Sequence, residues 1–399
     1  MNRAARLSVY YTARGYGKAK RRVYPTSLER AYILPYAGYT TDGRVLVRGR
    51  VLRSKPPKPP RPDDGAWRNL RNTLRRFRTK PVRRVELACG LPDGGEERFF
   101  TDGDGYFDVR MPAGAVAEAT GDERGMWAGW REGRTPADWG PQWAKVRLRI
   151  AARPERRADV PVVRTMPQTS FGVISDVDDT VVVTGATSTL TQLKHSIFWN
   201  AHSRVPFAGA AALYRALHRG PEPGVHEWNP VFYVSSSAWN LYDLFVDFFR
   251  INGFPLGPIH LRDLGLTKEH WIKSGHDHKL REAERIIDSF PGLPFLLIGD
   301  SGQKDATLYT ELCRVRPGRV RGVVIRDLKP GTPNQRLREA QQAMAEMGIP
   351  FLLERDSFAA AEHLAELGFV QAEALREVLA ERERDEQAAP AVELPRMRG

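Results

Sequence analysis

The sequence predicts an α/β protein in which a parallel sheet with helices on both faces follows a small β-sandwich. Two observations support this fold class. Between residues 41 and 152, short segments of alternating apolar and polar residues are separated by Gly-rich turns such as 102–105, a pattern typical of antiparallel strands. Between residues 165 and 370, apolar runs of strand length alternate with segments of helical period, which indicates strands joined by helical crossovers in one parallel sheet.

In the first half, residues 1–40 are mixed in composition and are expected to form an N-terminal arm. A basic β-sandwich domain is expected over residues 41–152, because turn residues there separate short segments with strand-like alternation. These segments are 44–52, 82–87, 98–101, 106–110 and 145–150. A polar joint over residues 153–164 is expected to lead into the second half.

In the second half, a domain over residues 165–370 is expected to contain the parallel sheet. Its expected strands are 171–175, 231–235, 295–299, 320–325 and 350–353. Its expected helices are 208–219, 238–252, 277–290, 305–315, 335–347 and 357–367. Residues 381–399 are charged and then rich in Ala and Pro, so this tail is expected to be disordered.

The composition is that of a globular protein without a disulfide framework. The 399 residues are 41% hydrophobic and 27% charged, which suffices for two domains with cores of their own. The only cysteines are Cys89 and Cys313, so a reducing compartment is expected. The sequence has neither a signal-peptide pattern nor an apolar run of about 18 residues, which predicts a cytoplasmic protein.

Positive charge is concentrated in the first half. The formal net charge is +13, to which residues 1–160 contribute +16 (34 Lys and Arg against 18 Asp and Glu) and residues 161–399 contribute −3. A basic surface attracts anionic lipid or nucleic acid through its long-range field. A compositional bias toward arginine explains the choice of residue, but it does not explain the difference between the halves.

Residues 67–84 carry the densest positive charge, with eight basic residues and no acidic one. Apolar residues recur there at helical spacing, as in a basic helix that lies on an anionic bilayer. The residues expected at such a surface are Trp67, Arg68, Arg71, Arg75, Arg76 and Arg78. In the alternative interpretation, the apolar face packs on the β-sandwich and the arginines are solvated.

Two carboxylates follow the first apolar strand of the second half, in the segment Ser175-Asp176-Val177-Asp178-Asp179-Thr180. Asp176 and Asp178 stand at i and i+2, so they point to the same side of an extended chain. Crowded carboxylates repel each other unless a cation or a shared proton relieves them. Mg²⁺ suits such an all-oxygen site. The alternative interpretation is a strand followed by an Asp-rich turn.

Three later segments carry polar residues that suit a phosphate site. Ser235 is the last residue of the expected strand 231–235, where a hydroxyl can bind a phosphate oxygen or simply cap the next helix. Asp300 and Asp305 lie in the Gly-rich segment after the strand 295–299. Lys279 can neutralise a phosphoryl group during its transfer, although Lys273 and Lys304 are alternatives at this loose spacing.

The two histidines before this lysine, His276 and His278, suggest a metal site only weakly. They lack a third ligand nearby in the sequence, and a helix start that faces solvent is the preferred interpretation.

Taken in order, these segments resemble the four motifs of the haloacid-dehalogenase-like phosphatases. More specifically, the second half is similar to the catalytic domain of the fungal actin-patch-associated, Mg²⁺-dependent phosphatidate phosphatase and its bacterial relatives. Besides the acidic motif, the matching stretches are Val205-Pro206-Phe207-Ala208-Gly209, Phe232-Tyr233-Val234-Ser235-Ser236-Ser237, Leu297-Ile298-Gly299-Asp300-Ser301-Gly302-Gln303 and Val324-Ile325-Arg326-Asp327. In the first half, Pro35-Tyr36-Ala37-Gly38-Tyr39 and Gly49-Arg50-Val51-Leu52 look like the bacterial members. The resemblance implies a Rossmann-like sheet of the haloacid-dehalogenase type.

The resemblance also implies a role for each motif. Asp176 would attack phosphorus and form an aspartyl-phosphate, and Asp178 would act as the general acid and then the general base. Mg²⁺ would be held by Asp176, by the backbone carbonyl of Asp178 and by Asp300.

Two further pairs of residues would assist the reaction. Ser235 and Lys279 would stabilise the phosphoryl group during transfer. Thr180 and Asp305 would support and orient the other groups.

The leading functional hypothesis is therefore a Mg²⁺-dependent phosphatidate phosphatase, a phosphoric monoester hydrolase that acts on an anionic phospholipid. A cytoplasmic location with peripheral contact at the inner membrane face follows from it. The alternatives are a phosphatase of the same superfamily with a soluble substrate, and a non-catalytic protein that binds anionic lipid. Nucleic-acid binding is disfavoured, because no recognised nucleic-acid fold accompanies the arginine-rich segment.

Overall fold

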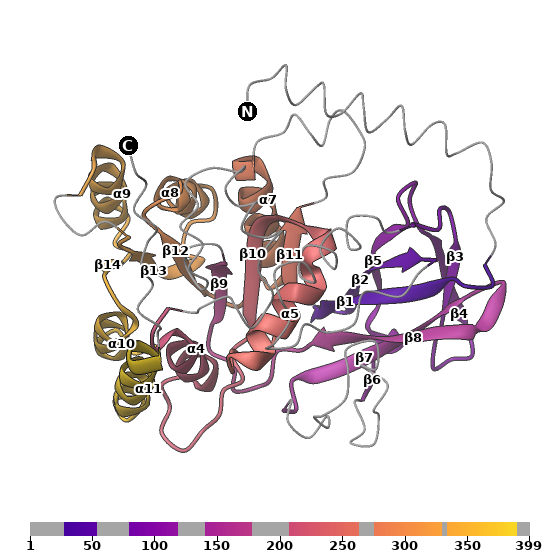
Figure 1. Cartoon of the computed structure of the whole chain (residues 1–399), viewed down its shortest axis with the longest axis horizontal. Helices are drawn as coiled ribbons and strands as arrows, with labels where there is room; N and C mark the ends of the chain where they lie inside the picture. Colours follow the sequence, from indigo (N-terminus) through magenta and orange to yellow (C-terminus); the bar gives the residue numbers. More distant parts are fainter. Residues whose placement is uncertain are drawn as a thin grey trace, which may run out of the picture.

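The computed structural model of the chain describes residues 28–53, 80–118, 140–177, 207–262, 275–328 and 333–388. Their strands form two sheets, an eight-stranded sheet A from the first half and a six-stranded sheet B from the second (Figure 1). None of the described helices combines the length and the apolar character that crossing a membrane requires.

Sheet B is the expected parallel sheet. Its strands are β9 (Gly172–Asp176), β10 (Val231–Ala238), β11 (Ile259–Arg262), β12 (Phe295–Asp300), β13 (Val320–Arg326) and β14 (Phe351–Glu354). They pair in the order β11-β10-β9-β12-β13-β14, and every pair is parallel. In chain order this is the 3-2-1-4-5-6 arrangement of doubly wound sheets, which bind ligands where the order reverses. Here the reversal lies between β9 and β12.

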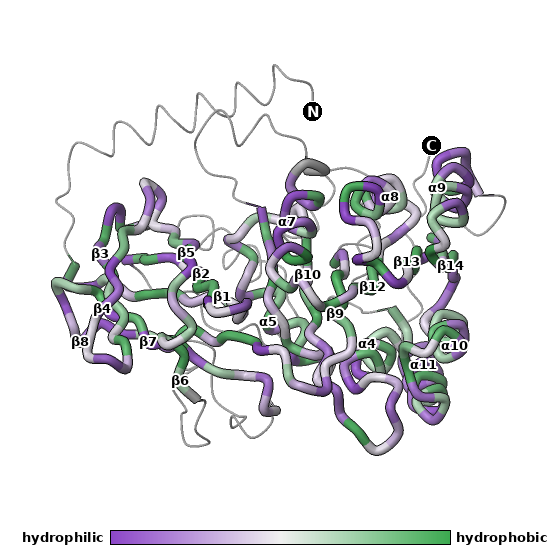
Figure 2. The backbone as a smooth tube through the Cα atoms, turned by 180° about the vertical axis from the view of Figure 1, so that it is seen from behind, coloured by the Kyte–Doolittle hydropathy of each residue, from purple (hydrophilic) through white to green (hydrophobic). Residues whose placement is uncertain are grey.

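Helices cover both faces of sheet B, because side chains alternate along strands whose two faces are both apolar. On one face, α4 (Ala210–Arg219), α5 (Tyr242–Ile251), α10 (Ser357–Glu366) and α11 (Ala374–Ala388) share a core with Val173 of β9. On the other, α7 (Gly275–Ser289), α8 (Asp305–Val315) and α9 (Gln335–Glu346) share a core with Ile174. Figure 2 shows the apolar strands enclosed between helices with polar outer segments.

Sheet A is a single curved sheet and not the expected two-sheet sandwich. Its strands are β1 (Tyr32–Thr41), β2 (Arg44–Leu52), β3 (Glu86–Gly90), β4 (Glu96–Phe100), β5 (Tyr106–Pro112), β6 (Ala117–Glu118), β7 (Trp143–Ile150) and β8 (Arg153–Val163). The order is β4-β3-β7-β8-β1-β2-β5, with β6 on β7. The end strands β4 and β5 approach each other, so the sheet nearly closes around its core. The alternation of apolar and polar residues within short strands is the same in a single curved sheet and in a two-sheet sandwich, so it does not distinguish them.

Strand β1 lies in the region that was expected to be an arm. Pro35 and Gly38 obscure its pattern, yet Tyr36 and Tyr39 on either side of a bulge are buried. Gly38 is required there, since a Cβ would lie 2.0 Å from the Leu46 carbonyl oxygen. The adjacent Ala37 N–H donates to the Tyr242 hydroxyl at 2.7 Å, so β1 joins the two halves of the molecule.

Two other segments that were expected to lack regular structure are ordered. Residues 153–163 form β8, which pairs with β7 and with β1. Its first residues are charged and exposed, which explains why the stretch resembles a polar joint. Helix α11 extends through Ala388, and Glu381 in it accepts a hydrogen bond from the Ala212 N–H at 2.6 Å. Residues 381–388 are therefore helical, and the rest of the expected tail lies outside the described residues.

Candidate active site

Two carboxylates lie side by side where the strand order of sheet B reverses. Asp176 is the last residue of β9 and Asp300 is the last residue of β12. The two strands are neighbours, with Ile298 opposite Ser175 in the register. Both carboxylates are almost fully buried, with 1% of Asp176 and none of Asp300 exposed.

Asp305, at the start of α8, completes a buried acidic cluster. One carboxylate oxygen from each of Asp176, Asp300 and Asp305 lies within 4.8 Å of the others. The Asp300 N–H donates to Asp305 Oδ2 at 3.3 Å. A Cβ on Gly299 would lie 2.7 Å from the Cβ of Asp305. The glycine therefore lets the helix start approach the strand end.

Lys279 of α7 supplies the positive charge of the cluster. Its Nζ lies 2.8 Å from Asp176 Oδ1 and 2.9 Å from Asp305 Oδ1. Burial alone lowers the pKa of this ammonium, but Asp176 and Asp305 outweigh that effect and raise it. Lys279 therefore stays protonated near neutral pH. Lys304, one of the alternatives, is exposed, and Lys273 lies outside the described residues.

Gln303 is a member of the site that sequence reasoning missed. Its Nε2 donates to Asp176 Oδ2 at 3.3 Å, and its Oε1 accepts from Lys279 Nζ at 3.1 Å. The residue belongs to the Gly-rich segment after β12 that also contains Asp300 and Asp305, so its position in the sequence could have indicated a place in the site. The backbone N–H groups of Gly302 and Gln303 donate to Asp300 Oδ1 at 2.7 and 2.8 Å and hold the turn after Asp300. This turn directs the Gln303 amide toward Asp176, which the sequence alone does not show.

Ser235 lies on the strand beside Asp176. It is fully buried, and it follows Val234, which is the register partner of Asp176. Its Oγ accepts a hydrogen bond from the Ser237 N–H at 3.0 Å. The strand continues to Ala238, and the helical turn after it has no side-chain cap. Ser235 is thus not the helix cap that was considered as an alternative.

The acidic cluster fits a divalent cation. When all its groups are ionised, three carboxylates and one ammonium leave a net negative charge. Burial and the neighbouring Asp305 raise the pKa of Asp300 to about 7. Asp300 Oδ2 is buried and has no hydrogen-bond partner among the described residues. An all-oxygen donor set with an unused buried oxygen is what a hard divalent ion requires.

Several predicted site residues lie outside the described residues. They are Asp178 and Thr180 of the acidic motif and the six candidate membrane-surface residues Trp67, Arg68, Arg71, Arg75, Arg76 and Arg78. Residues 80–84, at the end of the basic segment, are described and are not helical. Pro81 instead forms a β-bridge with Leu52, so a helix over 67–84 is wrong at its C-terminal end.

Arg326, which had no predicted role, ends β13 opposite Asp300 in the register. Its guanidinium lies 3.3 Å from the ring centroid of Phe207. Burial lowers its pKa to about 10, so it remains a cation at neutral pH. It is a second positive group at the same edge of sheet B.

Comparisons with known proteins concern the second half of the chain. Residues 171–327 match the family model described as phosphatidate phosphatase APP1, catalytic domain. The phosphatidate phosphatase APP1 of Saccharomyces cerevisiae is 28% identical over 189 residues, which are 46% of this chain and 31% of the yeast protein. An uncharacterized protein of Schizosaccharomyces pombe is 27% identical over 180 residues, 43% of this chain and 27% of that protein. The matched region thus spans less than a third of either relative.

Proposed function

We propose that this chain is a Mg²⁺-dependent phosphatidate phosphatase with a haloacid-dehalogenase-type fold. Residues 171–327 belong to the family of the APP1 phosphatidate phosphatase catalytic domain. One observation carries the proposal. Asp176, at the reversal point of sheet B, lies 2.8 Å from the buried ammonium of Lys279 and within the cluster that also contains Asp300 and Asp305. The proposed nucleophile, a cation for the phosphate and the proposed metal-binding oxygens would thus meet at one point.

In the first step, a carboxylate oxygen of Asp176 attacks the phosphorus of the lipid phosphate. A P–O bond to Asp176 forms while the bond to the glycerol oxygen breaks, which gives an aspartyl-phosphate and a lipid alkoxide. Asp178 donates a proton to that alkoxide, so diacylglycerol leaves as a neutral alcohol. Lys279 and Ser235 stabilise the charge on the phosphoryl oxygens.

In the second step, water hydrolyses the aspartyl-phosphate. Asp178, now ionised, accepts a proton from the water as its oxygen bonds to phosphorus, and the bond to Asp176 breaks. Inorganic phosphate leaves and both carboxyl groups return to their starting states. Gln303 holds Asp176 Oδ2 at 3.3 Å, while Lys279 holds Oδ1 at 2.8 Å. These two contacts fix the orientation of the nucleophile.

Asp176, Asp300 and the backbone carbonyl of Asp178 are the groups that would hold Mg²⁺. The bound ion would screen the negative charges of the carboxylate and the phosphate from each other. Asp305 supports this arrangement, because its two oxygens accept hydrogen bonds from Lys279 and from the Asp300 N–H. It therefore positions the neighbouring groups.

The lipid substrate agrees with the charge distribution of the chain. Residues 1–160 carry a net charge of +16, which favours contact with the anionic surface where phosphatidate resides. We assign this contact to the basic segment that contains Trp67, Arg68, Arg71, Arg75, Arg76 and Arg78. The protein would then act as a peripheral enzyme at a bilayer.

The test compares phosphate release from phosphatidate in anionic vesicles with release from soluble phosphomonoesters, each with Mg²⁺ or with EDTA. We expect Mg²⁺-dependent release with a preference for phosphatidate. Asp176→Asn should abolish it while the far-UV circular dichroism is retained, and Asp42→Asn in an exposed turn is the matched control. A preference for the soluble esters would replace the lipid assignment, and unchanged turnover in Asp176→Asn would exclude the mechanism.

A further inference from the structure

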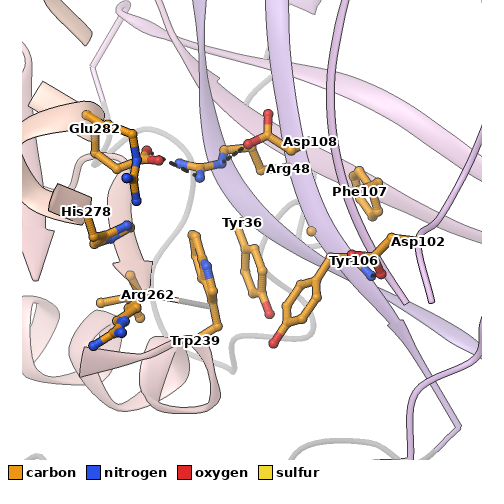
Figure 3. A pocket seen from close by; sticks show the side chains of 13 residues that line it. Tyr36, Arg48, Asp102, Tyr106, Phe107, Asp108, Trp239, Arg262, His278 and Glu282 are labelled. Carbon is orange, nitrogen blue, oxygen red and sulfur yellow. Dashed lines mark hydrogen bonds and ion pairs between the residues drawn. The ribbon is translucent and has the colours of Figure 1, made fainter. Parts of the chain in front are cut away.

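A pocket of about 300 Å³ lies between sheet A and the β11 edge of sheet B (Figure 3). Both halves of the chain form its walls. Tyr36, Arg48 and Tyr106 come from sheet A, and Trp239, Arg262 and α7 come from the second half. No step of the mechanism above uses this pocket.

Some residues that line the pocket lie at the same edge of sheet B as the acidic cluster. Arg262 is the last residue of β11, which pairs in parallel with β10, and β10 pairs in parallel with β9. Asp176 is level with His260 of β11, so two strand spacings and two residues along the strand separate Arg262 from Asp176, which is about 12 Å in all. Trp239, another lining residue, follows β10 directly. One small molecule can reach both places.

Helix α7 connects the two places. His278, Arg281 and Glu282 stand at i, i+3 and i+4, so they lie on one face of the helix and line the pocket. Lys279, the residue after His278, reaches Asp176 at 2.8 Å. The same helix thus contributes one wall of the pocket and the cation of the acidic cluster.

The walls are held in place by Arg48. Its Nη1 lies 2.7 Å from His260 Nδ1, its Nε lies 3.3 Å from Asp108 Oδ2, and its Nη2 lies 3.5 Å from Glu282 Oε2. Its guanidinium carbon also lies 5.0 Å from the ring centroid of Trp239, and the Trp239 ring is stacked on Tyr36. The pocket is therefore already formed before any ligand binds.

The chemistry of the walls favours an uncharged ligand. Three guanidinium groups face three carboxylates: Arg48, Arg262 and Arg281 against Asp102, Asp108 and Glu282. Because these charges balance, the pocket does not attract a second anionic group. The remaining walls include aromatic rings, which pack against hydrocarbon. A ligand with hydrogen-bond acceptors and short apolar parts fits both features.

We propose that this pocket binds the uncharged glycerol-ester part of a lipid phosphomonoester while the phosphate lies at Asp176. The inference rests on the proposed function. The N–H groups of Arg281, which is exposed on α7, donate to ester carbonyl oxygens, and the rings of Tyr106 and Trp239 contact the first methylenes. A volume of about 300 Å³ holds about ten heavy atoms, the size of a glycerol with two ester groups. The acyl chains continue beyond the pocket.

Binding is tested first with dioctanoylglycerol and the whole chain in EDTA, by isothermal titration calorimetry. The wild-type protein should bind, and Tyr106→Ala and Arg281→Ala should each weaken binding about fivefold to tenfold, since each removes one contact. Phe100→Ala on β4, where the ring is 64% exposed, is the matched control. Thermal melting establishes that each variant folds. Absent binding, or binding unchanged in both pocket variants, would overturn the proposal.

Turnover provides a second test. The ratio of kcat/KM for dioctanoyl phosphatidate to kcat/KM for glycerol 3-phosphate should fall about fivefold to tenfold in each pocket variant. Equal losses for the two substrates would mean that the variants act through the fold, and the proposed subsite would be wrong. If the proposed function is wrong but the pocket proposal is right, dioctanoylglycerol would still bind although no phosphatidate is hydrolysed.

Discussion

Lys279 Nζ lies 2.8 Å from Asp176 Oδ1, inside the protein, although the two residues are far apart in the sequence. Helix α7 carries the lysine on one face of sheet B, and β9 carries the aspartate within the sheet. Because the ammonium also lies 2.9 Å from Asp305 Oδ1, one cation compensates two buried carboxylates. A buried charge with such partners is costly to remove.

Lys279→Met should therefore reduce both stability and activity. It leaves Asp176 and Asp305 without their cation, so the free energy of unfolding should fall by about 3–5 kcal/mol. Phosphate release should fall about 10²-fold or more, because the phosphoryl oxygens lose an electrostatic contact. Urea unfolding and kcat measure the two effects. Lys304→Met, at a nearby exposed lysine, should change neither, and an equally active Lys279→Met would contradict the assigned role.

The assignment of Asp300 to metal binding predicts a thermal shift. Mg²⁺ should raise the Tm of the wild-type protein relative to EDTA, because an ion that binds only the folded state stabilises it. The shift should be much smaller in Asp300→Asn, which loses the buried Oδ2 without changing shape. Asp288→Asn removes a surface ion pair with Arg316 and serves as the control. A Mg²⁺ shift of the same size in Asp300→Asn and in the wild type would exclude Asp300 as a ligand.

Much of the second half could be predicted from its sequence, because its strands are buried on both faces and its helices are amphipathic. The expected helix 305–315 is α8 with the same bounds. Asp176, Asp300 and Asp305 meet because strand ends of a parallel sheet share one edge, and this edge is readable from the order of motifs. The structure confirms this proximity, because one carboxylate oxygen of each residue lies within 4.8 Å of the others.

The first half was harder to predict for a physical reason. Some of its strand pairs are local hairpins, but others join distant segments, and β1 pairs in parallel with β8 across more than a hundred residues. Strand β1 contains Pro35 and Gly38, which locally resemble turn residues. The contact of Arg48 with His260 and Glu282 likewise joins the two sheets. No local pattern encodes such a contact, so the pocket between the sheets could not be expected from the sequence.

His260 predicts how stability depends on pH. Burial lowers its pKa from 6.5 to about 4, and Arg48 and Arg285 act in the same direction against the opposing effect of Glu282. Between pH 6.5 and about 4, His260 is therefore mostly protonated in the unfolded chain and mostly neutral in the folded protein. The free energy of unfolding should fall as the pH is lowered through this window, by at most about 1.4 kcal/mol per pH unit for this group.

Urea unfolding at several pH values measures this slope. His260→Gln should flatten the dependence, whereas Phe100→Ala, at an exposed residue that does not titrate, should leave it as in the wild type. His278, which also lies near Glu282 and Arg48, and the partly buried His218 contribute in the same direction, since burial lowers the pKa of each to about 4. The slope should therefore decrease without vanishing. An identical slope in His260→Gln and the wild type would contradict the prediction.

The basic segment predicts how the protein meets a bilayer. Replacement of Arg68, Arg71, Arg75, Arg76 and Arg78 by Gln removes five positive charges, and each is worth up to about 1 kcal/mol at an anionic surface. The affinity for phosphatidate-containing vesicles, measured by cosedimentation, should fall by up to about 5000-fold and become less sensitive to salt. The control has the same net charge and replaces five exposed arginines of the second half, Arg314, Arg336, Arg338, Arg355 and Arg376. If both variants bind equally, overall charge and not this segment determines membrane contact.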